Sequence, residues 1–323
     1  MSKTIRIGVS AVLLGYVAWH TDWPKFAQAF ARLQAGLWLA AVGLLLVTQV
    51  VSAVRWRLLA RALGFERPLV QLTGIYFIGM YFNLLLPTSV GGDVVRAWYL
   101  DGGSRRRLAA FASVFLDRVS GLLVLLAMAC VALMLSPLAL PPWVSLFVWG
   151  SVAVSLLGLA AVPLLAGHGA GGASRRARLA AALTALRSPR VLAGTTLMSL
   201  WVQGANVVVV WLVGRAIGAP VSFDYYWIMV PMVSLLTMLP VSINGIGLRD
   251  WGTALFLAPL GVGQGTALPL ALLWFAVYAA ASLAGGFVYL FGRFPRPAAA
   301  AEMADETADG DPLSAAGEHR VAA

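Results

Sequence analysis

The sequence predicts an all-α polytopic membrane protein with about six full spans plus two opposed re-entrant hairpins, arranged as a transporter-like inverted repeat. The first observation behind this prediction is composition: the 323 residues are 60% hydrophobic and only 11% charged, with a mean hydropathy of +0.85. Repeated runs of about 20 apolar residues are long enough to span a bilayer. The second observation is a broken hydrophobic segment that occurs twice. The third is the position of the basic residues in the loops.

The broken segment is LPTSVGGDVVRAW at 86–98, and its copy is LPVSINGIGLRDW at 239–251. The two windows share Leu, Pro, Ser, Gly, Arg and Trp without a gap, at a separation of 153 positions (240 minus 87). The repeat extends upstream, because RALG at 61–64 recurs as RAIG at 215–218. Helix-breaking and polar residues survive at membrane depth only where they are buried in protein or line a wet cavity. Paired broken segments of this kind point to the binding site of a transporter.

Taken in order, the apolar runs lie at about 5–19, 37–54, 69–86, 108–135, 143–166, 191–213, 225–240, 247–260 and 266–292. Lys3 and Arg6 precede the first run, and no small-residue cleavage site follows it, so we expect an uncleaved first span. The segment 23–33 has one apolar face at helical spacing, which predicts an interfacial amphipathic helix. The members of this face are Trp23, Phe26, Ala27, Phe30 and Leu33.

Loop arginines indicate the topology, because Lys and Arg near span ends are retained on the cytoplasmic side. If 69–100 dips in and returns on the cytoplasmic side, and 225–260 returns on the outer side, the basic clusters all lie inside. They are Lys3, Arg6, Arg55, Arg57, Arg61, Arg67, Arg105, Arg106, Arg107, Arg175, Arg176, Arg178, Arg187, Arg190, Arg293 and Arg296. Each half is then span, span, hairpin, span, and this odd number of crossings inverts the second half. The returning limb 94–100 reaches only about 10 Å as a helix, so the first hairpin is expected to be shallow or oblique.

The sequence therefore predicts one transmembrane domain at 1–293, with repeat halves at about 1–135 and 143–292. The tail 294–323 is acidic and without apolar periodicity, and we expect it to be disordered. We expect a multi-pass protein of a bacterial-type inner (cytoplasmic) membrane, with both termini in the cytoplasm. The net charge of +10 suits anionic lipid headgroups better than nucleic acid, since the arginines flank spans. The single cysteine, Cys130, excludes an internal disulfide.

Both hairpins carry residues that could bind a ligand. Pro87 and Pro240 are predicted hinges, and the glycines beside them would leave backbone amides free to face a substrate. A kinked helix packed closely through glycine is the structural alternative. The predicted substrate-binding residues of the hairpins are Ser89, Gly91, Gly92, Asp93, Arg96, Ser242, Asn244, Gly245, Gly247, Arg249 and Asp250.

Arg96 and Arg249 are the strongest binding candidates, because a guanidinium group can hold a phosphate with two parallel hydrogen bonds. The alternatives are snorkelling to the interface or a salt bridge with Asp93 or Asp250. Asp93 lies one helical turn before Arg96, so that pair would form easily.

Asp117 and Arg118 lie about ten residues into the run 108–135, where an isolated charge is costly. Adjacent helical residues point about 100° apart, so we expect these two to serve different partners. We expect Arg118 to face a cavity and bind substrate together with Asp117, with structural pairing to Asp93 or to a hairpin carbonyl as the alternative. No similar pair stands 153 positions later, so the halves are not chemically equivalent.

Polar residues at two other places are expected to have structural roles. Arg55, Trp56 and Arg57 end a predicted span, which is typical of an interfacial anchor, with headgroup recruitment as the functional alternative. The side chains of Gln49, Gln203 and Asn206 lie within spans, where interhelical hydrogen bonds are the usual role.

Signatures of an enzyme are mostly absent. The three histidines, His20, His168 and His319, lie in loops or the tail, so they form neither an intramembrane metal site nor a nucleophilic triad. No clustered carboxylates and no P-loop occur. We therefore expect no catalytic activity, no cofactor and no metal.

Four blocks of sequence resemble the lysylphosphatidylglycerol synthase transmembrane-region family, flippase-like membrane proteins related to the N-terminal part of the bacterial multiple peptide resistance factor. They are RWRLLARALG at 55–64, LPTSVGGDVVRAW at 86–98, SVFLDRVSGLL at 113–123 and LPVSINGIGLRDWG at 239–252. The resemblance covers about residues 5–292 and implies movement of lipids with polar headgroups between leaflets. The chain has no room for the aminoacyl-transferase domain of the resistance factor, so synthesis of a lysyl-lipid is not implied.

The function we expect is that of a lipid flippase for a polar, phosphate-bearing headgroup. The alternatives are a membrane-embedded glycosyl or phosphoryl transferase, or a non-catalytic subunit of a lipid or glycan synthesis complex. The expected partners are a membrane lipid with an anionic headgroup and, further, enzymes of lipid or glycan biosynthesis. The candidate arginines at 96, 118 and 249 balance the candidate aspartates at 93, 117 and 250, so internal pairing would satisfy the empty site.

Overall fold

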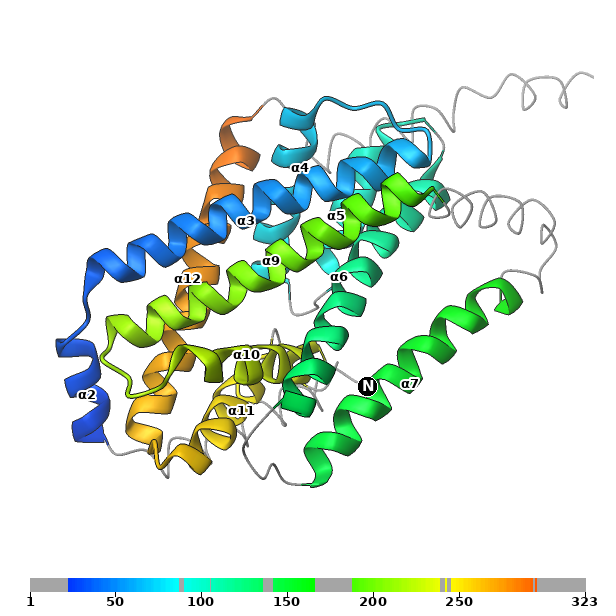
Figure 1. The fold of residues 1–323 in the computed structure, drawn as a ribbon. Coiled ribbons are helices and arrows are strands. Elements are labelled where there is room, and N and C mark those ends of the chain that lie inside the picture. The colour runs from blue at the N-terminus through cyan, green and yellow to red at the C-terminus, as the bar shows by residue number, and fades with distance from the viewer. Residues whose placement is uncertain are drawn as a thin grey trace, which may run out of the picture.

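The computed structural model describes residues 23–86, 90–104, 106–135, 142–165, 188–238, 242, 245–292 and 294. Every regular element within these ranges is helical, as predicted (Figure 1). The elements are α2 (Trp23–Ala31), α3 (Ala35–Ala62), α4 (Leu69–Leu85), α5 (Gly91–Asp101), α6 (Arg107–Leu135), α7 (Pro142–Leu165), α9 (Pro189–Ala216), α10 (Phe223–Met238), α11 (Leu248–Leu257), the 3₁₀ turn η1 (Ala258–Leu260) and α12 (Gln264–Phe291).

Helices α3 and α9 lie side by side and run antiparallel (Figure 1). The amide of Gln34, just before α3, donates to the carbonyl of Ala216 at the end of α9, at 2.8 Å. Near the other end, a Cβ placed on Gly194 of α9 would lie 3.2 Å from a methyl group of Leu58 in α3. The repeated blocks at 61–64 and 215–218 lie at the C-terminal ends of these two helices. The two copies of the repeat are therefore oppositely directed where they meet.

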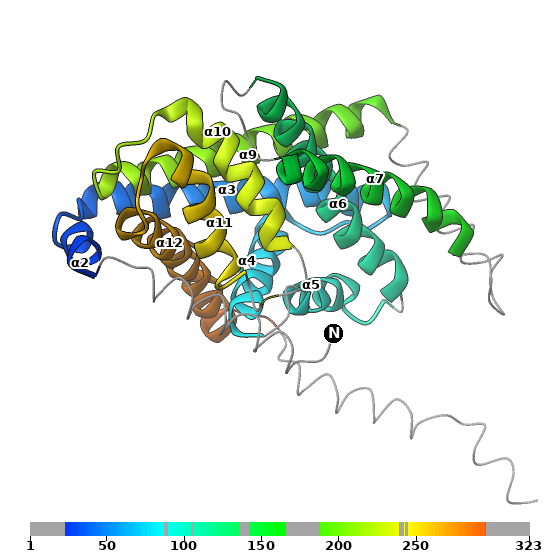
Figure 2. The same cartoon turned by 90° about the horizontal axis from the view of Figure 1, so that it is seen from below.

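Four helices are long and apolar enough to cross a membrane: α3, α6, α9 and α12, each of 28 or 29 residues. Each is about 42 Å long, which exceeds a hydrocarbon core of about 30 Å. They coincide with four of the six predicted spans. The predicted span at 5–19 lies outside the described residues. The predicted span at 143–166 is the helix α7, which packs against α6 and lies at the edge of the molecule opposite α2 in both views (Figures 1 and 2).

Helices α4 and α5 form a hairpin whose two ends lie together. The guanidinium group of Arg106, which follows α5, donates to the carbonyls of Leu63 at 2.6 Å and Gly64 at 3.0 Å, which precede α4. The chain thus returns to the end of the bundle from which it left, as the first predicted hairpin requires. Helix α5 has 11 residues and spans about 15 Å, so the returning limb is longer than the predicted 10 Å.

The hairpin closes through glycine. A Cβ on Gly92 of α5 would lie 1.9 Å from the carbonyl oxygen of Gly79 in α4, so the two backbones touch. Another glycine contact joins α4 to α12, because a Cβ on Gly285 would lie 1.9 Å from the carbonyl oxygen of Phe77. Close packing through glycine, the structural alternative given for the hairpin glycines, applies at Gly92.

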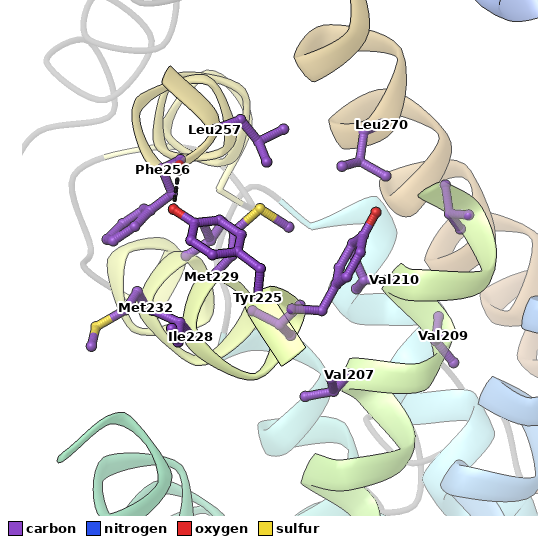
Figure 3. Close-up of a cluster of buried hydrophobic side chains, with 14 of the residues drawn as sticks. Val207, Val209, Val210, Tyr225, Ile228, Met229, Met232, Phe256, Leu257 and Leu270 are labelled. Atoms are coloured by element: carbon purple, nitrogen blue, oxygen red, sulfur yellow. Dashed lines mark hydrogen bonds between the residues drawn. The ribbon is translucent and has the colours of Figure 1, made fainter. Parts of the chain in front are cut away.

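Helices α10 and α11 form the second hairpin, and again its two ends lie together. The hydroxyl of Tyr225, at the start of α10, donates to the carbonyl of Phe256, at the end of α11 (Figure 3). This contact belongs to a larger cluster of buried apolar side chains that includes Val207 of α9, Met229 of α10 and Leu270 of α12 (Figure 3). Each hairpin also packs on the other half of the chain, since α4 contacts α12 and α10 contacts α6.

The predicted amphipathic segment is the helix α2, which packs against α12. The ring of Phe26 contacts those of Trp23 and Phe30, with centroids 5.4 and 5.0 Å apart. Trp23 and Phe30 are exposed, whereas Ala29 is buried. The helix is present where it was predicted, and its position at a membrane interface stays a prediction.

We expect Gly92→Ala to destabilise the fold, because the added methyl group would overlap the Gly79 carbonyl and overpacking typically costs about 1–3 kcal/mol. Gly43→Ala is the matched control, since nothing lies within 4 Å of a Cβ at Gly43 and alanine favours a helix. Thermal unfolding of the purified variants measures the difference. Equal melting temperatures for the two variants would contradict the close contact of α4 with α5.

Single-cysteine labelling tests whether each hairpin returns to its own side of the membrane. In a Cys130→Ser background, Glu66→Cys and Ser104→Cys should react with an impermeant thiol reagent from one side, and Pro220→Cys and Gly263→Cys from the other. All four positions are exposed and lie beyond helix ends. Labelling of positions 66 and 104 from opposite sides would mean that the segment 69–101 crosses the membrane completely.

Candidate functional site

A buried carboxylate joins two arginines inside the helix bundle. Asp117 lies ten residues after the start of α6, about 15 Å along the helix axis. Its side chain is 1% exposed. One carboxylate oxygen accepts from Nε of Arg55 at 2.9 Å, and the other accepts from Nη2 of Arg96 at 2.9 Å. Asp117 thereby connects α3, α5 and α6.

Arg96 is enclosed by aromatic rings. Its guanidinium carbon lies 4.0 Å from the ring centroid of Tyr76 and 4.4 Å from that of Trp56. Contacts of this kind are worth about 2 kcal/mol when they are desolvated. Arg96 also lies 3.6 Å from the carboxylate of Asp93, one turn earlier on α5. Because Arg96 is only 4% exposed, its charge depends on these neighbours rather than on water.

The prediction that Arg55 and Trp56 form an interfacial anchor is wrong. Arg55 is 5% exposed and Trp56 is fully buried. Besides its bond to Asp117, Arg55 donates to the hydroxyl of Ser199 in α9 at 2.9 Å, while the indole of Trp56 donates to the hydroxyl of Ser113 at 3.2 Å. The physical reason is that α3 continues for seven residues, about 10 Å, beyond Arg55.

Arg118 and Asp93 form the accessible part of the same network. Nε of Arg118 donates to the carboxylate of Asp93. Asp93 therefore lies between Arg96 and Arg118, just as Asp117 lies between Arg55 and Arg96. The side chain of Arg118 is 40% exposed, whereas those of Asp93 and Asp117 are 9% and 1% exposed. Asp117 and Arg118 have different partners, as predicted from their positions on the helix.

We call the network of Arg55, Asp93, Arg96, Asp117 and Arg118 the ion cluster. Its five residues line one cavity of about 280 Å³. The cluster contains three guanidinium groups and two carboxylates, a net charge of +1. Arg249 and Asp250 do not line the cavity. The prediction of a neutral site made of three arginines and three aspartates is therefore wrong. The complete lining is Gln49, Ser52, Arg55, Tyr76, Met80, Asn83, Asp93, Arg96, Asp117, Arg118, Gly121, Leu122, Leu125, Val202, Gln203, Asn206, Met238 and Tyr278.

The cavity brings the two hairpins together. Asn83 is near the end of α4, Met238 is the last residue of α10, and both line the cavity. The predicted hinges Pro87 and Pro240, with Ser89 and Asn244, lie outside the described residues. Several of the lining residues were not predicted as ligands, in particular Arg55, Tyr76, Asn83 and Tyr278.

The hairpin glycines have backbone roles in this structure. The amide of Gly92 donates to Oδ1 of Asn83 at 2.8 Å, so it does not face a ligand as predicted. Gly91 is the first residue of α5. Gly245 and Gly247 have φ angles of 74° and 80°, in the left-handed region that favours glycine, and they form the turn that starts α11.

The second hairpin carries a simpler arrangement. The guanidinium carbon of Arg249 lies 5.5 Å from the ring centroid of Trp274 and 5.3 Å from that of Phe275, both in α12. Asp250 accepts from the amide of Gly247 at 3.0 Å and so caps α11. Among the described residues, no carboxylate lies within 4 Å of the Arg249 guanidinium group. Ser242 is buried near this turn, and its hydroxyl has no hydrogen-bond partner in the described ranges.

Leu270 and Ala271 lie 153 positions after Asp117 and Arg118, and both are completely buried. Helix α12 as a whole contains no charged residue. The ion cluster therefore belongs to the first half alone, and the two halves differ chemically. Within the described part of the chain, no three His, Cys, Asp or Glu side chains come together, so no residue there is assigned to a metal.

Long apolar helices that surround a charged cavity define this chain as a polytopic membrane protein with an internal polar site. Residues 4–286 match the family described as the lysylphosphatidylglycerol synthase TM region. The chain belongs to this family, whose members are membrane proteins of lipid modification or transport. No match was found among curated proteins or among solved structures.

We expect Asp117→Asn to be strongly destabilising, because it leaves the buried charges of Arg55 and Arg96 without a full counter-charge. Breaking a buried ion pair by removing one partner typically costs about 3–5 kcal/mol. Asp250→Asn is the matched control, since an asparagine oxygen can still accept from the Gly247 amide. Thermal unfolding in detergent compares the two, and an equal effect of both substitutions would contradict the central role of Asp117.

Proposed function

We propose that the protein is a lipid transporter that moves a lipid with a polar, phosphate-bearing headgroup between the leaflets of a bacterial-type cytoplasmic membrane. The observation that carries the proposal is the ion cluster on the wall of a cavity inside membrane-spanning helices. Charged side chains at membrane depth are expensive and usually mark the pathway of a substrate or an ion. Arginine is the residue best suited to hold a phosphate.

The packing of the helices supports an inverted repeat. Helices α3 and α9 are antiparallel. The contact of α4 with α12 corresponds to that of α10 with α6, and the contact of α5 with α6 corresponds to that of α11 with α12. Exchange of the two halves leaves the α3–α9 contact unchanged and converts each of the other contacts into another one that is present. Two halves related in this way can rock about a central site to open it alternately to either side.

The cavity lies toward the basic end of the molecule. Arg55 is about 10 Å from the end of α3 and Asp117 about 15 Å from the start of α6, and these two helix ends meet where Arg106 contacts Leu63 and Gly64. Basic residues are retained on the cytoplasmic side. We therefore assign the cavity to the cytoplasmic half of the membrane, with both termini on that side.

In the proposed mechanism, a headgroup phosphate enters the cavity while the acyl chains stay in the bilayer. Arg118 is the most accessible cation of the cluster, and the phosphate takes the place of Asp93 beside it. Asp93 keeps its second partner, Arg96, so no bare charge is left in the membrane. Arg55, Arg96 and Asp117 hold the cavity wall in place.

The second step transfers the headgroup toward Arg249. Helix α12 connects the two places, because Tyr278 lines the cavity and Trp274, which lies against Arg249, is one turn away on the same face. Rocking of the halves then exposes the Arg249 region to the other leaflet. The interaction energies of the lipid in the two states decide which state is populated.

The alternative of a glycosyl or phosphoryl transferase has less support. That chemistry needs Asp93, Asp117 and Asp250 to converge on a metal or an acceptor. Both carboxylates of the cavity are held by arginines, and Asp250 caps α11 elsewhere. Turnover of a lipid-linked sugar by the purified protein with a divalent ion would establish the transferase. Partnership with enzymes of lipid or glycan biosynthesis stays compatible with a transporter.

Transport of a fluorescent phospholipid in proteoliposomes tests the proposal. We expect Arg118→Gln, and the double variant Arg96→Gln with Arg249→Gln, to lower the initial rate at least about tenfold, which corresponds to about 1.4 kcal/mol. Arg249→Lys should retain part of the rate, because charge is the first requirement there and hydrogen-bond geometry the second.

Arg61→Gln is the control for this assay, since Arg61 lies outside the cavity and makes an exposed pair with Glu66 at 3.6 Å. All variants are compared at equal folded yield. Unimpaired transport by the double Gln variant would refute the mechanism. Loss of folding in the Arg118→Gln variant would instead assign Arg118 to structural support of the first hairpin.

A further inference from the structure

We propose that Asp250 is a proton-binding site, whose carboxylate takes up one proton when the headgroup phosphate reaches Arg249. This inference rests on the proposed function, because it adds a proton to the second step of the transport mechanism. Three observations lead to it: the burial of Asp250 without a basic partner, the charge of the second hairpin once a phosphate is bound, and a buried hydroxyl group one helical turn away.

The carboxylate of Asp250 differs from those of the ion cluster. Asp250 is only 4% exposed, and no basic side chain among the described residues pairs with its carboxylate. Asp93 and Asp117, by contrast, each contact two arginines that balance their charge. Asp250 instead accepts from the amide of Gly247 at 3.0 Å. A protonated carboxyl group keeps that contact, because one of its oxygens remains an acceptor.

Arg249 is the charged group that acts on Asp250. Helix α11 packs against α10, α12 and η1. Besides Asp250, the titratable side chains of these four elements are Asp224, Tyr225, Tyr226, Arg249, Tyr278 and Tyr289. Among them, Arg249 alone has a noticeable electrostatic effect on Asp250. The charge of the Asp250 carboxylate is therefore balanced only as long as Arg249 has no other anion beside it.

The arrival of a phosphate changes this balance. In the empty state Arg249 and Asp250 are together neutral. A phosphodiester headgroup brings one negative charge, and its pairing with Arg249 leaves the buried carboxylate of Asp250 without a balancing charge. An uncompensated ion in such a place is strongly unfavourable, and a carboxylate there becomes neutral by binding a proton. One proton restores the neutrality of the second hairpin.

The protein offers an acceptor for the O–H group of a protonated Asp250. Thr253 lies three residues later, on the same face of α11, and helical side chains tilt toward the N-terminus of their helix. Thr253 is completely buried, and its hydroxyl has no hydrogen-bond partner within the described ranges. A buried polar group without a partner is costly. Protonation of Asp250 therefore supplies the donor that Thr253 lacks.

The step needs no reactant besides water. One O–H bond forms on the carboxylate, and no bond of the lipid breaks. The proton comes from water on the side to which the Arg249 region opens, and it returns to water when the headgroup leaves. In the gapless alignment of the two broken segments Ala97 corresponds to Asp250, so proton binding of this kind belongs to the second half.

The pH dependence of lipid transport in proteoliposomes tests the inference. Fluorescent phosphatidylglycerol is the probe, because its phosphodiester keeps one negative charge throughout and a change in rate then reports on the protein. We expect the initial rate of the wild type to fall at least about fivefold from about pH 6 to about pH 8, since fewer molecules carry the proton. Asp250→Asn imitates the neutral carboxyl group, so its rate should change less than about twofold over the same range.

Two further variants separate titration of Asp250 from a structural role. Asp224→Asn makes the same chemical change at an exposed position of α10 and should keep the wild-type pH dependence. Asp250→Glu retains a carboxyl group and should keep it as well. Loss of a purely structural contact would lower the melting temperature without removing the pH dependence. A wild-type rate that does not vary with pH, or an Asp250→Asn rate that varies as the wild-type rate does, would overturn the inference.

Calorimetric titration of the full-length protein in detergent counts the protons directly. Dihexanoyl phosphatidylglycerol is titrated in several buffers that differ in their heat of ionisation, and the variation of the observed heat gives the number of protons taken up on binding. We expect the wild type to take up protons and Asp250→Asn to take up none. Binding without proton uptake by the wild type would contradict the proposed site.

The two measurements fail in different ways. If the protein moves the lipid at a rate independent of pH and binds it without proton uptake, the proton inference is wrong and the transporter assignment stands. If binding takes up a proton that Asp250→Asn does not take up, and the lipid is not moved, the transporter assignment is wrong and the proton-binding site stands.

Discussion

The carboxylate of Asp117 holds two buried guanidinium groups together, and the arrangement of the helices around the cavity depends on this interaction. Arg55 comes from α3, Arg96 from the first hairpin, and Asp117 from α6. Arg55 also reaches Ser199 of α9. A single buried network therefore fixes a short hairpin against three long helices. Apolar packing alone would leave the rotation of α5 less well defined.

A buried ion network is weak evidence for stability, because apolar residues of similar volume are often as stable or more so. Its retention here needs another reason. The rings of Trp56 and Tyr76 enclose the guanidinium group of Arg96 and shield its charge from water. Arg118, by contrast, is the member of the cluster that is left partly open. The network thus separates charges that hold the wall from a charge that can meet a ligand.

Much of the fold could be predicted from hydropathy, because each long apolar run within the described residues became a helix near its predicted position. The hairpins could be predicted from the repeat and from the positions of the arginines. Arg55 was missed because a hydropathy run ends at its first arginine, although the helix continues to Ala62. The charge of Arg55 is neutralised by a residue 62 positions away, and no local pattern reports such a pairing.

Other contacts depended on local geometry. Gly92 was expected to offer its amide to a ligand, but the turn of the hairpin brings Asn83 to that amide first. Asp250 and Arg249 are adjacent on a helix, as Asp117 and Arg118 are, and the same angular argument would have separated them. The amides of α3 and α9 were assigned to contacts between helices, which holds for Gln203. Gln49 and Asn206 line the cavity, as Gln203 does.

The restriction of the ion cluster to one half has a consequence for the energy landscape of a protein built from two copies of one unit. A perfectly symmetric pair of halves would populate its two rocked states equally. Helix α12 contains no charged residue, so the second half has no charged pair of its own. If the halves rock as proposed, one state keeps a network of charges that the other cannot reproduce, and the empty protein has a preferred resting state. A cargo that bound both states with equal affinity would leave that preference unchanged.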